Sequence, residues 1–275
     1  MLADLHLHTT ESDGTLTPTQ LVQAAQRIGL SAIAITDHDT TGGIEEAQSA
    51  APPGLQVIPG IELSTSTDAG DEVHIVGLWI DPHYAPLQRK LATLRKERVS
   101  RVDTMLKRLQ SLGIALRHED VLQFDHEDVL SRSHIAAALV KKGVVKTKQE
   151  AFDTYIGQGR PAYVKREKLT LEEAVGLILG SGGVPILAHP GLLKDLSILP
   201  RLIQAGLVGM EVIHHSHSAE QTDYFSQMAK DHALLPSGGS DCHGPGGKDE
   251  LYIGRYSIPW SWLEDLRAAR NNRIL

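Results

Sequence analysis

The stretch MLADLHLH, residues 1–8, opens the chain and guides the interpretation of the rest of the sequence. A short apolar run with histidines at alternate positions is typical of a buried strand. In a strand, residues i and i+2 point to the same side, so His6 and His8 can reach one cation. Histidine is also the commonest metal ligand among protein side chains. The stretch therefore predicts a strand that ends at a metal site.

Apolar segments of this kind recur along the chain and alternate with helical patterns. Strands are expected at residues 2–8, 31–37, 55–63, 72–80, 184–189, 208–214 and 234–241. Helices are expected near residues 17–29, 44–51, 171–179, 218–232 and 262–271. Strands separated by helices imply parallel pairing through crossovers. About seven such units favour an α/β barrel, with an open doubly wound sheet as the alternative.

One stretch, residues 83–165, breaks this alternation and contains no convincing core strand. Helical patterns are expected there at residues 87–112, 127–142 and 148–156. We interpret residues 83–165 as a helical insertion that caps the active site. The barrel domain is then discontinuous and consists of residues 1–82 and 166–275.

Side chains of the kinds that bind metals follow most of the expected strands. Catalytic groups of parallel barrels gather at the carboxyl ends of the strands, so one shared site is expected. The candidate ligands are His6, His8, Asp13, His38, Glu62, His74, His189, Asp241 and His243. A single histidine at a strand end is more often structural, but two His-x-His or Asp-x-His pairs favour a metal site. Zinc usually takes about four ligands, so this set suits two or three ions.

The composition is that of an ordinary globular protein and narrows the function classes. The chain has 275 residues, a formal net charge of −7 and one cysteine. The negative charge argues against a global basic field for nucleic acid, and one cysteine excludes an intramolecular disulfide framework. No apolar run has the length of a membrane span, and the first residues lack the features of a signal peptide. We expect a cytoplasmic enzyme.

Five short motifs resemble, in order along the chain, those of the PHP superfamily, named for polymerase and histidinol phosphatase. They are His6-Leu7-His8, Thr36-Asp37-His38, Gly60-Ile61-Glu62, Ala188-His189-Pro190 and Ser240-Asp241-Cys242-His243. The resemblance spans both ends of the chain, with residues 83–165 as the variable insert. It implies a distorted (β/α)7 barrel of the TIM-like type, a centre of two or three divalent ions and phosphoesterase chemistry.

The resemblance also implies how the ligands are shared among the ions. By position, the three groups are His6, His8, Glu62 and Asp241; Asp13, His38 and His243; and His74 and His189 with Glu62. Mixed nitrogen and oxygen donors suit manganese, zinc or iron. Manganese is the metal that we expect, with zinc or iron as alternatives.

Two groups of basic residues in the insertion are candidates for binding phosphate. Arg98 lies on the apolar face of the first expected helix, and Arg101 follows one turn later on nearly the same face. A buried charge needs a partner, and guanidinium groups bind phosphate through forked hydrogen bonds. Arg132 and His134 lie at an expected helix N-terminus, which favours anions. Alternatively, the arginines reach water or local carboxylates, and His134 binds the third ion.

The run EVIHHSH, residues 211–217, ends the sixth expected strand. Its spacing does not force any histidine to pair with a carboxylate on the same side of the strand. His217 is a candidate for an acid that protonates the leaving group, or for a substrate contact. A solvated loop is the alternative.

Within the superfamily, the insertion resembles that of the 3',5'-nucleoside bisphosphate phosphatases and related 5'-to-3' exoribonucleases. This implies removal of the 3'-phosphate from a nucleoside 3',5'-bisphosphate such as pAp, and trimming of short 5'-phosphorylated RNA. No membrane and no obligate protein partner is expected. One alternative is a histidinol-phosphate phosphatase or another small-molecule phosphomonoesterase. Another is a noncatalytic regulatory relative that binds metal or nucleic acid, which the complete ligand set disfavours.

Overall fold

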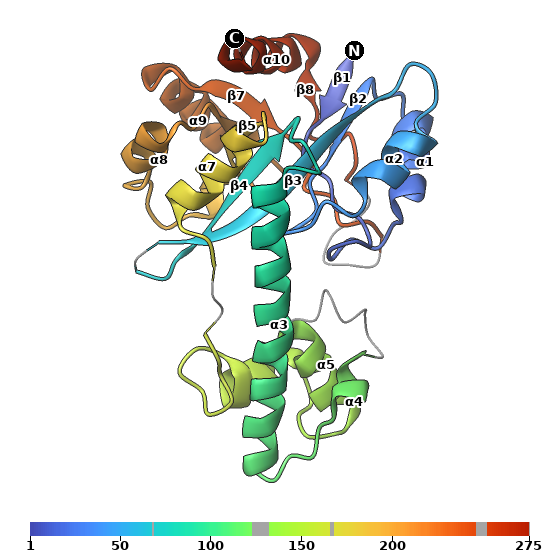
Figure 1. The fold of residues 1–275 in the computed structure, drawn as a ribbon, viewed down its shortest axis with the longest axis vertical. Coiled ribbons are helices and arrows are strands. Elements are labelled where there is room, and N and C mark those ends of the chain that lie inside the picture. The colour runs from blue at the N-terminus through green and yellow to red at the C-terminus, as the bar shows by residue number, and fades with distance from the viewer. Residues whose placement is uncertain (68, 123–131, 166–167, 246–251, 275) are drawn as a thin grey trace. The chain divides into compact units, whose positions relative to one another are not determined.

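The chain forms two compact units (Figure 1). The computed structural model describes residues 1–67, 69–122, 132–165, 168–245 and 252–274. The first unit consists of Met1–Gln88 and Lys168–Leu275, and the second of Arg89–Glu167. In the part of the chain that the structure describes, no helix is long and apolar enough to cross a membrane.

The first unit is built on one mixed sheet of eight strands in the order β7-β6-β5-β4-β3-β2-β1-β8. The strands are β1 (Leu2–Asp4), β2 (Ala32–Ile35), β3 (Gln56–Ser66), β4 (Glu72–Leu78), β5 (Val184–Leu187), β6 (Gly209–Ile213), β7 (Leu235–Gly238) and β8 (Ile258–Pro259). All seven strands expected from the sequence are present. The eighth, β8, was not expected, because two residues are too few to form an apolar pattern.

The sheet is nearly closed because the segments that follow β1 and β7 run beside each other. The amide of Leu5 donates to the carbonyl of Gly238 at 3.3 Å, and the amide of Asp241 donates to the carbonyl of His6 at 2.9 Å. Leu7 forms a parallel bridge with Cys242. The fold is thus the distorted α/β barrel that the sequence predicts, rather than an open doubly wound sheet.

One strand departs from the expected parallel arrangement. β4 is antiparallel to both β3 and β5. Only five residues separate Ser66 at the end of β3 from Glu72 at the start of β4, whereas a parallel crossover needs about a dozen or more. The expectation of parallel pairing was therefore wrong at β4. As a result, the first residues of β4 lie beside the carboxyl end of β3, with His74 opposite Ser64.

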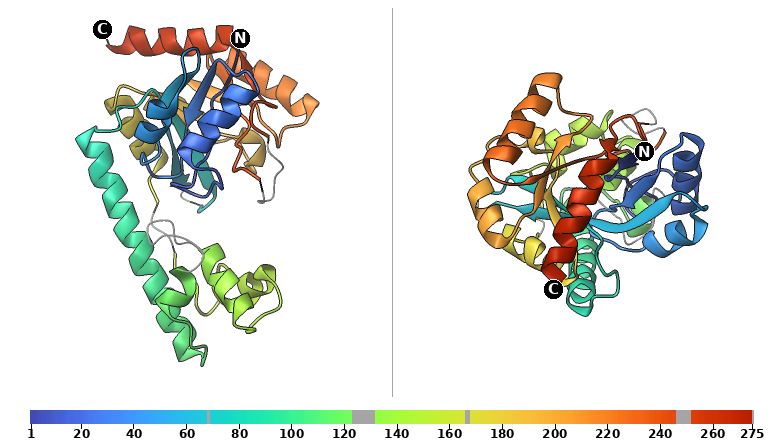
Figure 2. Two further views of the ribbon diagram at one scale, coloured as in Figure 1. Left: turned by 90° about the vertical axis from the view of Figure 1, so that its right-hand side faces the viewer. Right: turned by 90° about the horizontal axis from the view of Figure 1, so that it is seen from above.

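Helices pack on the outside of the sheet (Figure 1). They are α1 (Pro18–Arg27), α2 (Ile44–Ala50), α7 (Leu171–Gly180), α8 (Leu199–Ala205), α9 (Ala219–Asp231) and α10 (Trp260–Ile274). The first helix begins as the sequence indicates, with a capping box in which Thr17 and Gln20 bond each other's backbone amides. Figure 2 shows α10 lying across the end of the sheet at which β1 begins, where Leu263 and Leu266 join the core.

The second unit is helical and has its own apolar core. Its elements are α3 (Ala85–Ser111), which begins in the first unit, α4 (His118–Leu122), α5 (Arg132–Lys141), α6 (Lys148–Ala151) and a π-helix, η2 (Phe152–Ile156). Met105 and Leu109 from α3 pack with Ile135 and Leu139 from α5. Residues 127–131 of the helix expected at 127–142 lie outside the described residues.

The closure of the barrel depends on Gly239, since a Cβ at this position would overlap the backbone and Cβ of His6. Gly239→Ala should therefore lower the free energy of unfolding by about 1–3 kcal/mol, as overpacked sites do. Gly176 in α7 faces open space and is a matched control. Gly176→Ala should raise stability by about 0.5–1 kcal/mol. Urea unfolding followed by circular dichroism measures both, and equal effects would contradict this account.

Candidate metal centre

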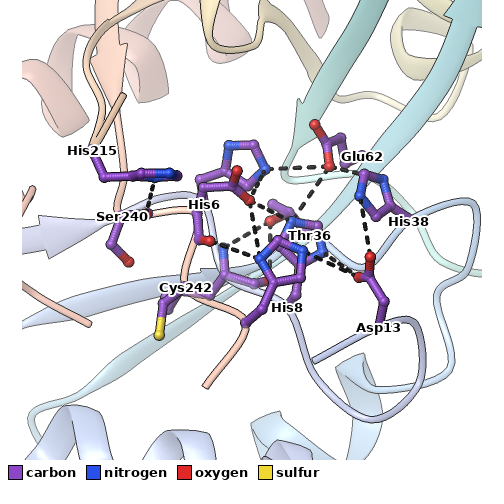
Figure 3. Close-up of polar contacts among 12 residues, drawn as sticks. His6, His8, Asp13, Thr36, His38, Glu62, His215, Ser240 and Cys242 are labelled. Carbon is purple, nitrogen blue, oxygen red and sulfur yellow. Dashed lines mark hydrogen bonds and ion pairs between the residues drawn. The ribbon is translucent and has the colours of Figure 1, made fainter. Parts of the chain in front are cut away.

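The nine predicted ligands come together at one end of the barrel in the first unit. Figure 3 shows His6, His8, Asp13, His38 and Glu62 among them. The strand order explains why, because each of these residues lies in or beside a strand near that end. His6 and His8 extend β1, His38 follows β2 and Glu62 lies in β3. His189 follows β5, and Asp241 and His243 follow β7. His74 joins them because β4 runs in the opposite direction.

The carboxylate of Glu62 lies at the centre of the cluster, buried in the barrel. Its Oε1 lies 2.9 Å from His74 Nδ1 and 3.0 Å from His189 Nε2. Its Oε2 lies 2.9 Å from His38 Nδ1. One carboxylate therefore contacts imidazoles from three other segments of the barrel, as expected for a bridging ligand.

The two histidines of the opening motif face Glu62 and Asp241 through the same ring atom, Nε2. His8 Nε2 lies 3.0 Å from Asp241 Oδ1 and 3.4 Å from Glu62 Oε2. His6 Nε2 lies 3.4 Å from each of these two oxygens. The four side chains place one ligand atom each within 4.8 Å of one another, which is a suitable geometry for a single cation.

A second group forms around Asp13, on the loop after β1. Asp13 Oδ1 lies 3.2 Å from His243 Nε2, and Oδ2 lies 3.9 Å from His38 Nε2. The rings of His8 and His243 stack with their centroids 4.2 Å apart. His8, Asp13, His38 and His243 form a further set that could hold an ion, and it differs from the resemblance-based group by the addition of His8.

Buried polar atoms at the centre of the cluster indicate that a cation belongs there. Among the described residues, five such atoms form no hydrogen bond: Nε2 of His6, Nε2 of His8, Nδ1 of His38, Oε2 of Glu62 and Oδ1 of Asp241. The nitrogens and oxygens of this group lie at ion-pair distances from one another, but the geometry of these contacts is poor for hydrogen bonds. Leaving a buried polar atom unsatisfied is costly, and bound cations would satisfy these five atoms: His6, His8, Glu62 and Asp241 form one candidate set, and His38 belongs to its neighbours. The residues present therefore fit the two or three ions expected.

The cluster strongly shifts the pKa values of its members. Burial would lower the pKa of His74, but Glu62 and Glu72 raise it to about 10. Burial also opposes a charge on His243, yet Asp13 raises its pKa to about 9. Conversely, burial would raise the pKa of Glu62, but the histidines around it hold it well below its ordinary value. Ionised carboxylates thus lie beside protonated imidazoles as long as no metal replaces the protons.

Two of the predicted ligands and one neighbouring residue have strained backbone conformations. Asp39, His189 and Asp241 have positive φ angles of 52°, 28° and 51°. Such strain costs about 1–3 kcal/mol per residue and clusters at functional sites.

Buried carboxylates outside the ligand set hold the surrounding backbone in place. Asp37 accepts hydrogen bonds from the amide of Thr9 at 2.7 Å and the hydroxyl of Ser12 at 2.6 Å, and so fixes the loop that carries Asp13. Asp4 accepts from the amides of Ser240 and Gly254. The amide of His6 is a third donor to Asp4. These three amides stabilise the ionised carboxylate only in part, so burial still raises the pKa of Asp4 to about 6.

Sequence reasoning did not assign two buried residues that contact the cluster, Glu211 and His214. Glu211 Oε1 lies 2.8 Å from His6 Nδ1, and His214 Nε2 lies 3.4 Å from Asp241 Oδ2. The available signal was a carboxylate inside the apolar strand β6, where a charge needs a buried partner. The sequence could not show that this partner would be a histidine of β1.

His217 lies near this group but bonds the backbone with both ring nitrogens. Its Nδ1 donates to the carbonyl of Val212 at 3.0 Å, and its Nε2 accepts from the amide of Gly191 at 3.2 Å. Burial lowers its pKa. A role as an acid or substrate contact remains a prediction.

The predicted phosphate-binding residues lie in the second unit. Arg98 and Arg101 line a cavity of about 370 Å³ together with Lys165. Arg101 Nε donates to the carbonyl of Val164 at 2.9 Å. The guanidinium of Arg132 stacks over Phe152, 5.5 Å from the ring centroid, and over Tyr163. His134 lies in the first turn of α5, close to Arg132 in sequence and therefore on the same part of the unit.

Comparison with known proteins agrees with the resemblance to the PHP superfamily. The profile of the PHP domain family matches residues 4–87. A 3',5'-nucleoside bisphosphate phosphatase from Chromobacterium violaceum is 40% identical over 255 residues, which cover 90% of this chain and 89% of that protein. The 5'-3' exoribonuclease Rnm from Salmonella typhimurium is 37% identical over 254 residues, with coverage of 89% and 86%. A crystal structure from Bifidobacterium adolescentis, described as a metal-dependent phosphoesterase, has a TM-score of 0.82 at 33% identity, with coverage of 97% and 95%.

The raised pKa values of His74 and His243 predict that metal binding depends on pH. Only neutral imidazole binds a metal, so protons must leave these rings when an ion enters. The affinity should therefore rise with pH up to the pKa values of these two rings, about 9 for His243 and about 10 for His74. Calorimetric titration of the metal-free protein with Mn²⁺, in two buffers of different ionisation enthalpy, gives the number of protons released. Binding without proton release would contradict the prediction.

Proposed function

The chain belongs to the PHP family of metal-dependent phosphoesterases, and we propose that it removes the 3'-phosphate from nucleoside 3',5'-bisphosphates such as pAp. The products are the 5'-nucleotide and phosphate. The observation that carries the proposal is the similarity of nearly the whole chain to the bisphosphate phosphatase of Chromobacterium violaceum. The ion-binding cluster agrees with it, because every predicted ligand lies at the same end of the barrel.

The metal centre in this proposal holds two or three divalent ions, with manganese expected and zinc or iron as alternatives. One position uses His6, His8, Glu62 and Asp241, and a second uses Asp13, His38 and His243 with His8 at its edge. The third uses His74 and His189 with Glu62. Bound ions of this kind polarise phosphoryl oxygens and lower the pKa of water.

The chain's own residues determine where the phosphate can be placed. Glu62 and Asp241 remain ionised because neighbouring histidines lower their pKa values, so each would offer a charged oxygen to a bound cation. The cysteine in the final motif is not a nucleophile in this proposal. The thiol of Cys242 is buried, its pKa is raised by burial, and its sulfur points away from the imidazoles (Figure 3).

The second unit supplies the residues that bind the substrate's other phosphate in this proposal. Arg98 and Arg101 in one cavity offer the forked donors that suit a terminal phosphate. Arg132, oriented by Phe152 and Tyr163, and His134 at the start of α5 would bind the same anion. The 5'-phosphate would be held here while the 3'-phosphate lies among the ions.

A second activity, trimming of short 5'-phosphorylated oligoribonucleotides, is favoured by the similarity to the exoribonuclease Rnm. Such a strand presents the same 5'-phosphate as a bisphosphate. The bond that is cut is then the phosphodiester between the first and second nucleotides, instead of the ester bond to a terminal 3'-phosphate.

A turnover panel with a defined metal tests the substrate, with phosphate release measured for the monoesters and nucleotide release for the oligoribonucleotide. With Mn²⁺ bound, pAp should be the best of four compounds: pAp, 5'-AMP, histidinol phosphate and a 5'-phosphorylated oligoribonucleotide. 5'-AMP should be poor because it lacks the 3'-phosphate. Good turnover of histidinol phosphate with inert pAp would refute the proposal. No turnover of any compound by metal-loaded protein would favour a noncatalytic relative.

Arg98→Ala tests the anchor for the 5'-phosphate. Hydrogen bonds to charged groups contribute about 1.5–3 kcal/mol, so KM for pAp should rise at least about tenfold. Turnover of a simple aryl phosphate should change little, since it has no second phosphate. Arg95→Ala is a matched control, because Arg95 is an exposed residue of the same helix that does not line the cavity. Equal losses on both substrates would exclude the anchoring role.

A further inference from the structure

We propose that Glu211 is a positioning residue that orients two ligands of the metal centre, His6 and His189, at the same time. The inference rests on the metal centre proposed above and assigns a role to a residue that contacts no substrate. Glu211 lies in β6, and its side chain is 1% exposed. Each of its two oxygens bonds a different strand end.

The first contact fixes the ring of His6. Glu211 Oε1 lies 2.8 Å from His6 Nδ1. An ionised carboxylate can only accept a hydrogen bond, so the proton of a neutral His6 lies on Nδ1. The other nitrogen, Nε2, then presents its lone pair to the ion position beside Glu62 and Asp241. A carboxylate that receives the second N–H of a ligating histidine is a common support for bound metals.

The second contact fixes the backbone of His189. Glu211 Oε2 accepts from the amide of His189 at 2.7 Å. This residue has a φ angle of 28°, a conformation that its surroundings must stabilise. With the amide held, the ring places Nε2 at 3.0 Å from Glu62 Oε1. The carboxylate of Glu211 thus connects the ligand of one proposed ion position with that of another.

The chemistry of the strand supports a functional rather than a purely structural role. A buried charge contributes little to stability, because its desolvation offsets the attraction of its partners. The neighbouring β6 positions hold apolar residues such as Met210 and Val212, both fully buried. A glutamate here is explained by the two ligand residues that it bonds.

Glu211→Gln is the discriminating variant because it preserves shape but replaces one acceptor with a donor. Its amide oxygen can accept from either His6 or the amide of His189, but not from both. Asp37→Asn is a matched control that alters another buried carboxylate of the same rim. Asp37 bonds Thr9 and Ser12, in the loop that carries Asp13, and so supports a different ion position.

The experiment uses Zn²⁺ as a diamagnetic probe of the full-length protein and of both variants. Competition with a chromophoric chelator gives the number and affinity of bound ions. Long-range ¹H–¹⁵N spectra of the histidine rings show which nitrogen carries a proton and which binds zinc. Substitution of each histidine in turn assigns the signals.

In wild-type protein, His6 should carry its proton on Nδ1 and bind zinc through Nε2. Glu211→Gln should remove this pattern and weaken binding about 10–100-fold at the positions of His6 and His189. The zinc-bound signal of His243 should persist. Asp37→Asn should instead perturb His243 and retain the His6 pattern.

Two outcomes would overturn the inference while leaving the metal centre intact. One is wild-type affinity and an unchanged His6 signal in Glu211→Gln. The other is a uniform loss at all positions in both variants, which would indicate general destabilisation. Failure of the wild-type protein to bind zinc would refute the proposed metal centre itself, and the inference with it.

Discussion

The burial of one carboxylate, that of Glu62, among five imidazoles is the constraint on which the rest of this structure depends. The rings belong to His6, His8, His38, His74 and His189. An ionised group in the interior of a barrel is stable only with close compensating partners. Those partners come from four separate strands, so the strand ends must converge. A barrel meets this requirement, whereas a flat open sheet would keep the outer strands apart.

Several backbone features serve this convergence. The reversed direction of β4 brings His74 to the carboxyl ends of its neighbours. Gly239 permits the close approach that closes the barrel beside His6. Positive φ angles at His189 and Asp241 turn the chain immediately after β5 and β7. The strained conformations at His189 and Asp241 are tolerated because the polar contacts of the cluster stabilise them.

The kinds of side chain that form the site were predictable from the sequence. The contacts among these side chains were predictable only in part. Histidines and carboxylates at the ends of apolar strands indicated the nine candidate ligands, which the structure brings together at one end of the barrel. The role of Glu211 was not predictable, since its partners lie about two hundred positions earlier in the chain and in the turn after β5. The short β8 and the helix α8 also lacked a sequence pattern.

The sequence by itself determined the alternation of strands and helices, the helical character of the stretch after β4, and the ligand types. Each of these follows from local periodicity and from the chemistry of single side chains. Only the tertiary structure decided the antiparallel direction of β4, the closure beside Gly239 and the sharing of ligands around Glu62. The reason is physical: pairing direction, close backbone approach and the pairing of buried charges depend on residues far apart in sequence. The MLADLHLH stretch contains two of the candidate metal ligands, His6 and His8, and the fold decided that both would face Glu62 and Asp241.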